Sequence, residues 1–357
     1  MARVPAFQAG HAGSIPVTRS LSQPGRRPLR FAPYHQLDGI PNVVVDGSPT
    51  DGTVLTLSHW PGTPTPAGLE RDLSVQMALA YLDSWDLHGS AEVVSNNHFD
   101  QDGLTSAFAF VDPDGAAVRS QFLTEVGAAG DFATTEDRAA ARVSMTIAAF
   151  ADKDRTPLES PDEDYETWCA TLYQELLGRL PELCEHPERF RNLWAAEDAT
   201  LDASQAAIAT GGVLIEEIPA LDLAVVTVPD DAPTAGGHRF ASQWTMGLHP
   251  IAINNATSML SLLTIRGATC EFAYRYESWV QYRSRRPRPR VDLGPLAEQL
   301  TADETSGVHW VADRVSGLTP TLHTAGSEQS SLPADHVRRR LIDHLTSSSP
   351  AFDPYPA

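Results

Sequence analysis

Short apolar runs alternate with longer amphipathic stretches through the first half of the chain. Residues 42–46 and 53–58 are apolar runs bounded by glycine and proline, which is typical of buried strands. Apolar residues recur near helical spacing over 68–85, and the run 91–94 predicts another strand before the helix-forming residues 104–109. This strand–helix–strand order predicts a parallel sheet covered by helices, with ligands at the carboxyl ends of its strands.

The pattern changes near Gly211. Further helices are predicted at 117–129, 136–151, 164–180 and 188–209, followed by strands at 213–215, 223–228, 250–253 and 262–282, and a last helix at 333–345. A chain of 357 residues exceeds the roughly 250–300 at which single cores stop growing. We therefore predict an α/β protein with a mainly parallel, helix-flanked sheet and a second, smaller α+β domain. Its predicted parts are a flexible arm (1–37), a metal-binding domain (38–210), a substrate-binding domain (211–330), and a C-terminal helix and tail (331–357).

Composition and charge exclude several classes of partner. The formal net charge of −20 argues against long duplex nucleic acid and anionic membranes, which attract basic surfaces. No apolar window approaches the ~18–20 residues of a membrane span, and the N-terminus lacks the apolar segment of a signal peptide. Three cysteines without a Cys-x-x-Cys pair suggest neither a disulfide framework nor a cysteine zinc site. We expect a cytoplasmic protein, and a homodimer is left open.

The segment 97–103 carries an imidazole and two carboxylates at alternating positions after a predicted strand. In an extended backbone, His98, Asp100 and Asp102 project to one side and can converge on one point. Mixed imidazole and carboxylate ligands suit manganese, iron or zinc better than calcium. An EF-hand would place a glutamate at the twelfth position, which counted from His98 is Ala109. The alternative is a turn in which Asp100 or Asp102 only caps the following helix.

Three further residues are candidates for the same site. Asp46 and His59 end neighbouring predicted strands, and Asp131 stands just before a predicted helix, where it could act as a cap instead. We expect His59 to be a ligand or general base. The predicted metal ligands are Asp46, His98, Asp100, Asp102 and Asp131, and the predicted catalytic residues are His59 and Asp102. Two Mn²⁺ ions are expected, with Mg²⁺, Fe²⁺ or Zn²⁺ as alternatives.

Six arginines and four aromatic residues gather between 274 and 290 in this otherwise acidic chain. Strand alternation would place Arg275 and Trp279 on one face. Guanidinium groups bind phosphate and aromatic rings stack on bases, so we predict Arg275 and Arg283 as substrate contacts, together with His249. The alternative is an edge strand and a basic loop that pairs with the protein's own carboxylates.

The sequence His98-Phe99-Asp100-Gln101-Asp102-Gly103-Leu104-Thr105-Ser106 resembles the first motif of the DHH phosphoesterase superfamily, a strand-end His/Asp-x-Asp-x-Asp-Gly-x-x-Ser pattern that binds manganese. The resemblance implies that His98 and Asp100 bind one metal and that Asp102 helps to bind a second. Ala129-Gly130-Asp131 looks like the Gly-Asp stretch of that superfamily. The chain departs from it in lacking an Asp-His-His triplet, and Asp46 and His59 precede the motif. The whole chain looks like an uncharacterised bacterial family related to the superfamily.

The expected function is metal-dependent hydrolysis of a phosphoester, in a small phosphorylated compound or a short nucleotide, by metal-activated water. A non-catalytic metal- or nucleotide-binding regulatory protein on the same fold is the alternative that the missing triplet favours. A haloacid-dehalogenase-like phosphatase is a further alternative, because residues 99–103 resemble its Asp-x-Asp-Gly motif. That class needs Thr where this chain has Leu104, and the only lysine, Lys153, follows Asp131 instead of preceding it.

Overall fold

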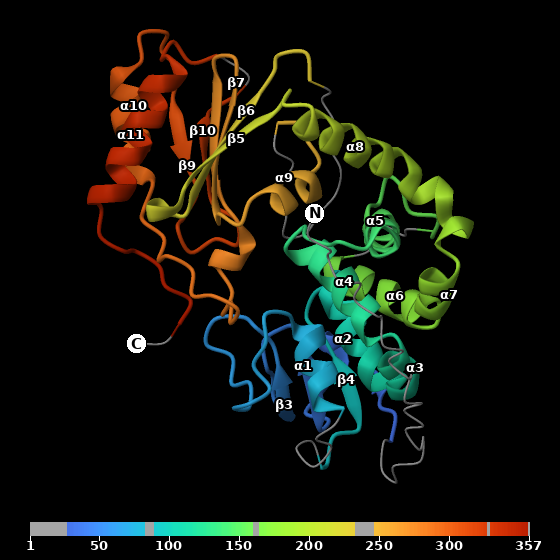
Figure 1. The fold of residues 1–357 in the computed structure, drawn as a ribbon. Coiled ribbons are helices and arrows are strands. Elements are labelled where there is room, and N and C mark those ends of the chain that lie inside the picture. Colours follow the sequence, from blue (N-terminus) through green and yellow to red (C-terminus); the bar gives the residue numbers. More distant parts are fainter. Residues whose placement is uncertain (1–26, 83–88, 160–163, 233–245, 327–328, 356–357) are drawn as a thin grey trace, which may run out of the picture.

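The computed structural model describes residues 27–82, 89–159, 164–232, 246–326 and 329–355. These residues form two β-sheets with helices packed around them (Figure 1). The first sheet has the strand order β1-β4-β2-β3, and the second has the order β5-β6-β7-β8-β10-β9. All pairs in the first sheet are parallel, whereas the second sheet is mixed, with a parallel β6–β7 pair and antiparallel pairs elsewhere. The predicted α/β class is confirmed.

The first sheet sets the position of the predicted site. Its strands are β1 (Arg30–Phe31), β2 (Asn42–Val45), β3 (Thr53–Leu57) and β4 (Val93–Ser95). Every residue of β2 and β4 is buried, as the continuous apolar runs predict for strands covered on both faces. Because β2 lies between β4 and β3 and all three run in parallel, the segments that follow them meet at one edge of the sheet.

Helices of the first half follow the predicted periodicity. They are α1 (Ser74–Tyr81), α2 (Gln101–Val111), α3 (Pro113–Val118), α4 (Ser120–Asp131), α5 (Arg138–Ala151), α6 (Tyr165–Leu177), α7 (Leu180–Glu185) and α8 (Arg191–Ala209), with 3₁₀ turns η1 (Tyr34–Gln36) and η3 (Pro187–Phe190). The predicted start of the first helix at 68 is wrong, because Gly68 has a φ of +90° and Leu73 is extended. Residues 83–85 of that prediction lie outside the described residues.

Strands of the second sheet are β5 (Leu214–Ile218), β6 (Leu223–Val228), β7 (Ser261–Arg266), β8 (Thr269–Tyr274), β9 (Trp310–Ala312) and β10 (Thr321–Thr324), with a 3₁₀ turn η4 (Pro219–Leu221). The helices α10 (Gly294–Asp303) and α11 (Ala334–Ser347) lie together beside this sheet (Figure 1). Val337 and Leu341 of α11 share a core with Phe272 and Leu322 of the sheet. The predicted C-terminal helix is α11, and it packs into the core of the second sheet.

The predicted arm at 1–37 is also wrong at its C-terminal end. Arg30 and Phe31 form β1, which pairs with Val93 and Val94 of β4, so the folded chain begins before residue 38. Residues 1–26 of the predicted arm lie outside the described part of the chain.

One strand prediction in the second half is wrong, and another holds only in its first part. The apolar run 250–253 belongs to a helix, α9 (Pro250–Ala256), because Pro250 suits the first helical position and the His249 side chain accepts a hydrogen bond from the Ile251 amide. The run 262–282 is a hairpin, β7–β8, that ends at Tyr274 and continues into the 3₁₀ turn η5 (Tyr276–Ser278). A short apolar run does not by itself distinguish a strand from a helical segment.

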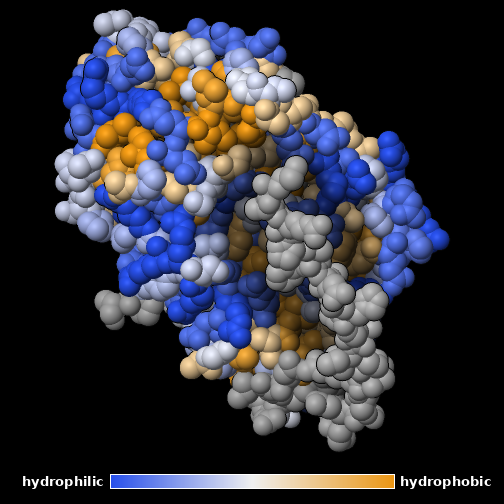
Figure 2. All heavy atoms as spheres, viewed as in Figure 1, coloured by the Kyte–Doolittle hydropathy of each residue, from blue (hydrophilic) through white to orange (hydrophobic). Residues whose placement is uncertain are grey.

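Apolar side chains also occur on the surface and where the two halves of the chain meet. Figure 2 shows a mostly hydrophilic face on which apolar side chains gather over the second sheet. Tyr276 and Val280, which follow β8 of the second sheet, pack into the large hydrophobic core of the first half.

Among the helices that the structure describes, none has the length and apolar content that a membrane crossing requires.

Candidate metal centre

Three neighbouring strand ends place the predicted histidines and Asp46 together. Asp46 directly follows β2, His59 follows β3, and His98 follows β4. Asp46 has a φ of +48°, a left-handed conformation that aspartate tolerates better than most residues. All three side chains are almost completely removed from solvent, with His59 at 0% exposure. The structure thus gathers residues that are far apart in the sequence at the carboxyl edge of the parallel sheet, where ligands bind in such folds.

One backbone carbonyl orients the His59 ring. Its Nδ1 lies 2.6 Å from the carbonyl oxygen of Asp72, which can only accept, so Nδ1 carries the proton and Nε2 of the neutral ring is a bare lone pair. This Nε2 lies 3.4 Å from Asp46 Oδ1 and 3.5 Å from Asp131 Oδ2. Burial lowers the pKa of His59, although the charge of Asp46 acts in the opposite direction. A lone pair and two carboxylates that face one another in this way are stabilised by a cation.

His98 faces a second pair of carboxylates. Its Nε2 lies 2.9 Å from Asp100 Oδ2 and 3.3 Å from Asp46 Oδ2. Burial lowers the pKa of His98, but the charge of Asp100 and hydrogen bonds to Asp100 and Asp46 outweigh it and raise this pKa to about 10. Burial raises the pKa of Asp100, but the charge and hydrogen bond of His98 lower it overall. His98, Asp100 and Asp46 thus form a buried group of potential ligands that could hold a metal ion.

Asp100 also caps α2. Its Oδ1 accepts a hydrogen bond of 2.8 Å from the Gly103 amide, while Oδ2 faces His98. Capping and ligand contact, which were alternatives for the sequence, coexist in this residue. A carboxylate with two oxygens can serve the helix terminus with one and a neighbouring cation with the other.

Asp102 does not follow the strand alternation. The helix α2 begins at Gln101, so Asp102 lies in its first turn and the three residues of the 98–102 motif do not converge on a single point. Asp102 Oδ2 accepts from the Ser74 amide at 2.7 Å, and Oδ1 accepts from the Val75 amide at 2.9 Å. These are the first amides of α1, so Asp102 caps a helix other than its own. One of its carboxylate oxygens also lies within 4.8 Å of the potential ligand atoms of Asp46, His59 and Asp131.

Asp131 completes that group from the end of α4. It does not cap the next helix, because Asp137 does so by accepting from the Ala139 and Ala140 amides. Asp131 is 2% exposed, and its Oδ2 makes no hydrogen bond with any residue that the structure describes. Burial, followed by the charges of Asp100 and Asp102, raises the pKa of Asp131 well above its ordinary value. A buried carboxylate oxygen with no donor is expected where a cation binds.

Asp46 is shared by two groups of potential ligands. The first group consists of Asp46, His59, Asp102 and Asp131, and the second consists of Asp46, His98 and Asp100; within each, the ligand atoms lie within 4.8 Å of one another. Oδ1 of Asp46 faces His59, and Oδ2 faces His98. Four buried carboxylates against two imidazoles leave excess negative charge, which divalent cations would neutralise. Oxygen and nitrogen donors without thiolates fit manganese, magnesium, iron or zinc.

Aromatic side chains cover the centre, and some come from the second half of the chain. The Tyr276 hydroxyl lies 3.3 Å from His59 Nε2, and the Trp60 ring lies 5.1 Å from the His98 ring. Trp279 packs against both Trp60 and Tyr276. Sequence reasoning missed Tyr276 as a site residue. Its only signal was membership of the aromatic and arginine-rich window, and its position depends on the turn that follows β8.

Arg275, predicted to bind substrate, has its guanidinium engaged inside the protein. Its side chain forms an ion pair with Glu277 and donates to the carbonyl oxygens of Thr257 and Met259, and the residue is only 6% exposed. The predicted alternation of Arg275 with Trp279 is wrong, because the chain turns instead of continuing as a strand.

The other two predicted substrate contacts have different surroundings. His249 is fully buried, caps α9, and has its Nε2 3.2 Å from Glu197 Oε1, so it belongs to neither ligand group. The side chain of Arg283 is 38% exposed, and its backbone amide donates to the side chain of Asp72, whose carbonyl holds His59. Its guanidinium donates to Gln281 Oε1 at 2.9 Å and lies 3.7 Å from Glu70 Oε1, while its backbone amide ties it to the loop that holds His59.

The remaining arginines of the 274–290 window are bound to acceptors within the protein. Arg285 pairs with Asp222, Arg286 with Asp353, and Arg288 donates to the carbonyl oxygens of Ala220 and Leu345. Arg290 is fully buried. The alternative of a basic loop that pairs with the protein's own acceptors describes this segment better than a phosphate-binding strand.

The fold and the site define a two-sheet α/β protein whose buried aspartates and histidines can hold metal ions. The chain belongs to a family described as a family of unknown function (DUF6687), whose model matches residues 27–356. Comparisons with curated proteins and with solved structures find no match. The matched range contains every residue of both ligand groups.

Proposed function

We propose that this chain is a metal-dependent phosphoesterase that hydrolyses a small phosphorylated compound or a short nucleotide. The observation that carries the proposal is the position of Asp46, which directs one oxygen toward His59 and the other toward His98. A carboxylate shared by two nitrogen- and oxygen-lined groups is typical of hydrolases that use two metal ions. Manganese is the metal we favour, with magnesium, iron or zinc as alternatives.

Each ligand group has a defined task in this proposal. His98 and Asp100 would hold one ion with Asp46, and His59, Asp102 and Asp131 would hold the other with Asp46. Bound ions would acidify a water molecule and screen the charge of a phosphoryl group. The backbone carbonyl of Asp72 keeps the Nε2 lone pair of His59 directed into the site by accepting a hydrogen bond from Nδ1–H.

Residues around the ligands would orient the substrate and exclude water. Burial, followed by the charge of Asp131, raises the pKa of Tyr276 well above its ordinary value, so its hydroxyl remains a neutral donor beside the centre. The rings of Trp60 and Trp279 lower the local dielectric, which strengthens electrostatic interactions in the site. Arg283, whose side chain is 38% exposed and whose backbone amide donates to Asp72, would bind phosphate by exchanging its contacts with Gln281 and Glu70.

The distribution of ligands supports a divergent relationship to the DHH phosphoesterase superfamily. That resemblance implies that His98 and Asp100 serve one metal and that Asp102 serves the other, and the two ligand groups have this division. Asp46 and His59 precede the motif in the chain. They can still complete the site, because parallel neighbouring strands end at one edge of a sheet whatever their order in the sequence.

The contacts of Asp100 and Lys153 favour a dehalogenase-like phosphatase less than the proposed metal-dependent phosphoesterase. Asp100 would be the nucleophile of such a phosphatase. One of its carboxylate oxygens already contacts the Gly103 amide, and the other contacts His98. Lys153 lies over the Trp168 ring, 6.0 Å from its centroid. A non-catalytic metal-binding protein is the second candidate, and the near-complete burial of every ligand favours it.

Metal content and turnover of matched variants test the proposal. The protein is loaded with Mn²⁺, freed of unbound ions, and assayed for manganese and for hydrolysis of bis(p-nitrophenyl) phosphate. We expect about two ions per chain, loss of both in Asp46→Asn, loss of one in Asp131→Asn and in His98→Ala, and turnover at least about 100-fold lower in all three. Asp202→Asn, an exposed carboxylate on α8, is the control and should match the wild type.

Two results would count against the proposal. Unchanged metal content and unchanged turnover in Asp46→Asn would refute the shared-ligand centre. Stoichiometric manganese without turnover of any phosphoester would support the non-catalytic candidate instead.

A further inference from the structure

Residues 353–355, which we call the strap, pack on the segment that follows η5. Figure 1 shows the chain leaving α11 and running toward the first half of the protein. Asp353 forms an ion pair of 2.7 Å with Arg286, and the Arg286 guanidinium lies over the Tyr355 ring, 4.8 Å from its centroid. The Tyr355 hydroxyl donates a hydrogen bond to the backbone carbonyl oxygen of Tyr282. The strap therefore holds the backbone at residue 282.

The segment 281–284 holds the His59 loop at two points. The Gln281 amide donates to the backbone carbonyl oxygen of His59 at 2.8 Å. The amides of Arg283 and Ser284 donate to Asp72 Oδ1 at 2.5 and 2.8 Å, and the Ser284 hydroxyl donates to Asp72 Oδ2. The carbonyl oxygen of Asp72 accepts from Nδ1 of His59 at 2.6 Å. One short segment thus fixes both the backbone of His59 and the group that orients its ring.

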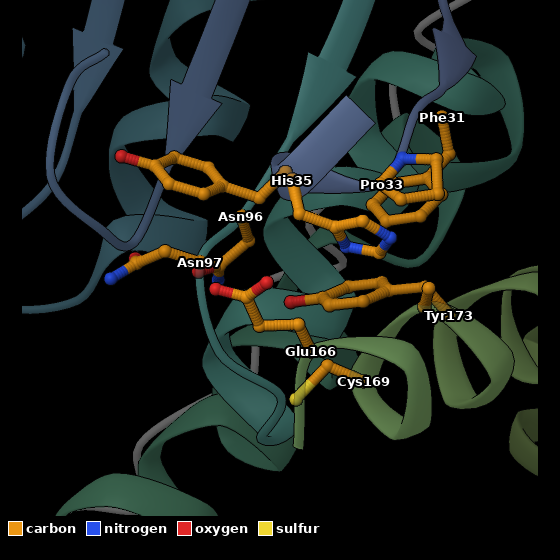
Figure 3. Close-up of a pocket in the computed structure, with 10 residues that line it drawn as sticks. Phe31, Pro33, His35, Asn96, Asn97, Glu166, Cys169 and Tyr173 are labelled. Carbon is orange, nitrogen blue, oxygen red and sulfur yellow. The ribbon is translucent and has the colours of Figure 1, made fainter. Parts of the chain in front are cut away.

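The two ligand groups have different surroundings. His59 follows β3, the edge strand of the first sheet, and the segment 281–284 contacts it there. Figure 3 shows that Asn96 and Asn97, which precede His98, line a cavity of about 180 Å³ instead. Neither the strap nor the segment 281–284 is among the described residues that line this cavity. The contacts of the strap are therefore linked to the group around His59.

These contacts contribute differently to folding and to metal binding. The Arg286 side chain is 64% exposed and that of Asp353 is 32% exposed, and ion pairs at such positions contribute little to stability. By contrast, loss of a group that orients a ligating histidine typically changes metal affinity about 10–100-fold. A change in metal binding without a comparable change in stability therefore distinguishes positioning of His59 from a merely structural role.

We propose that the strap is a positioning element for His59. By holding the carbonyl group of Tyr282, it keeps the segment 281–284 and the side chain of Asp72 in place, so that Nε2 of His59 stays directed toward Asp46 and the ion expected there. The proposal rests on the proposed metal-dependent function and adds a determinant of metal affinity that lies outside the ligand groups.

Exchange of the His59 Nδ1 proton with solvent tests the proposal in the metal-free, full-length protein. Labelling of histidine with ¹⁵N makes this proton visible by NMR, and His59→Gln identifies its signal. Tyr355→Phe keeps the ring but removes the donor to Tyr282, and Ser284→Ala removes one donor to Asp72. Both should raise the exchange rate at least about fivefold. Glu182→Gln, a partly exposed ion-pairing carboxylate of α7, is the control and should match the wild type.

Manganese binding shows which ligand group responds. In a His98→Ala background only the His59 group should hold an ion, and there Tyr355→Phe should weaken Mn²⁺ binding about fivefold and Ser284→Ala about tenfold. In an Asp131→Asn background the ion belongs to the His98 group, and Tyr355→Phe should leave its affinity unchanged. The unfolding midpoint of Tyr355→Phe should shift by less than about 3 °C.

Two results would overturn the proposal. One is an unchanged exchange rate in both Tyr355→Phe and Ser284→Ala. The other is an equal loss of Mn²⁺ affinity in the two backgrounds, because the strap would then act on the whole fold and not on His59. Failure of the proposed function looks different: a wild-type protein that binds no Mn²⁺, together with faster exchange in the variants, would refute the metal centre but support the positioning of His59 by the strap.

Discussion

The backbone carbonyl of Asp72 decides what His59 can do. By accepting a hydrogen bond from Nδ1–H it leaves Nε2 with a lone pair, directed toward Asp46 and Asp131. In the absence of a cation, the Tyr276 hydroxyl, 3.3 Å away, is the donor that Nε2 meets. A bound metal would replace this donor at Nε2. The contribution of the Tyr276 hydroxyl to stability should therefore depend on whether metal is present.

Tyr276→Phe tests this dependence. The ring and its stacking on Trp279 are kept, but the buried Nε2 of His59 loses its donor. We expect the metal-free variant to be about 1 kcal/mol less stable than the wild type, and the difference to shrink with saturating Mn²⁺. Urea unfolding with chelator and with Mn²⁺ measures both values. An equal loss in the two conditions would contradict a metal ligand role for Nε2.

At the scale of elements, Asp102 joins two helices. It stands in the first turn of α2 and accepts hydrogen bonds from the Ser74 and Val75 amides at the start of α1. A carboxylate at a helix N-terminus is stabilised by the amides and by the helix dipole. Asp131 is also buried, but its Oδ2 has no donor among the described residues. Burial, followed by the charges of Asp46 and Asp100, raises the pKa of Asp102 well above its ordinary value, as it does for Asp131. The two carboxyl groups should nevertheless respond differently to the same substitution, because Asp102 accepts two amide hydrogen bonds and Asp131 Oδ2 accepts none from the described residues.

We compare Asp102→Asn with Asp131→Asn in metal-free protein. Asp102→Asn should lower the free energy of unfolding by about 1–3 kcal/mol, because an amide can accept with only one oxygen. Asp131→Asn should leave it unchanged or raise it by up to about 1 kcal/mol, because it removes a buried charge that Asp100 and Asp102 repel. Chemical unfolding in chelator measures both. A large loss in Asp131→Asn would show that its carboxylate has a structural role like that of Asp102.

Glu304 links the end of α10 to the segment before α11. Burial raises the pKa of Glu304, but hydrogen bonds from Ser330, Ser331 and Trp310 outweigh it and lower this pKa from 4.5 to about 2. A carboxyl group whose pKa is depressed by folding stabilises the protein above its unfolded pKa, and this contribution is lost as the pH falls through the folded value. The relevant window runs from pH 4.5 down to about 2.

Glu304→Gln should accordingly lose about 1 kcal/mol at pH 7, a value reduced for solvent screening, and the difference from wild type should diminish below pH 4.5. Unfolding by denaturant at several pH values gives this profile. Glu298→Gln, an exposed position of α10, serves as the control. A difference that stays constant between pH 7 and 3 would contradict the assignment.

In the whole molecule, Arg290 connects segments that are distant in the sequence. Its fully buried guanidinium donates to Ser278 Oγ and to the carbonyl oxygens of Val315, Gly317 and Leu318. Its backbone amide donates to the Phe352 carbonyl near the C-terminus. Through the 3₁₀ turn that ends at Ser278, these contacts hold the aromatic residues that cover the candidate metal centre.

Arg290→Met should cost about 3–5 kcal/mol, because it leaves several buried acceptors without a donor. Arg286→Met removes an ion pair with Asp353 in which the arginine side chain is 64% exposed, and should cost less than about 1 kcal/mol. Thermal and denaturant unfolding measure both. Similar losses in the two variants would refute the connecting role of Arg290.

Local pattern determined much of this protein. The apolar runs that form β2, β3 and β6 and the periodic stretches that form α5 and α8 were recognisable, because strand and helix spacing is a property of neighbouring residues. The expectation that Asp46, His59 and His98 meet also came from sequence, since parallel strands end at one edge of a sheet. The strand predicted at 250–253 is wrong, because four apolar residues fit a buried strand and the first turn of α9 equally well.

Tertiary structure decided how the site is divided and covered. That Asp102 caps α1, that Asp46 is shared by two ligand groups, and that Tyr276 reaches His59 all depend on contacts between segments far apart in the chain. The same holds for Arg275, which looked available for phosphate but is enclosed with Glu277. Sequence spacing fixes where a side chain leaves its own element, whereas burial, charge pairing and the choice of partner arise only when distant elements pack together.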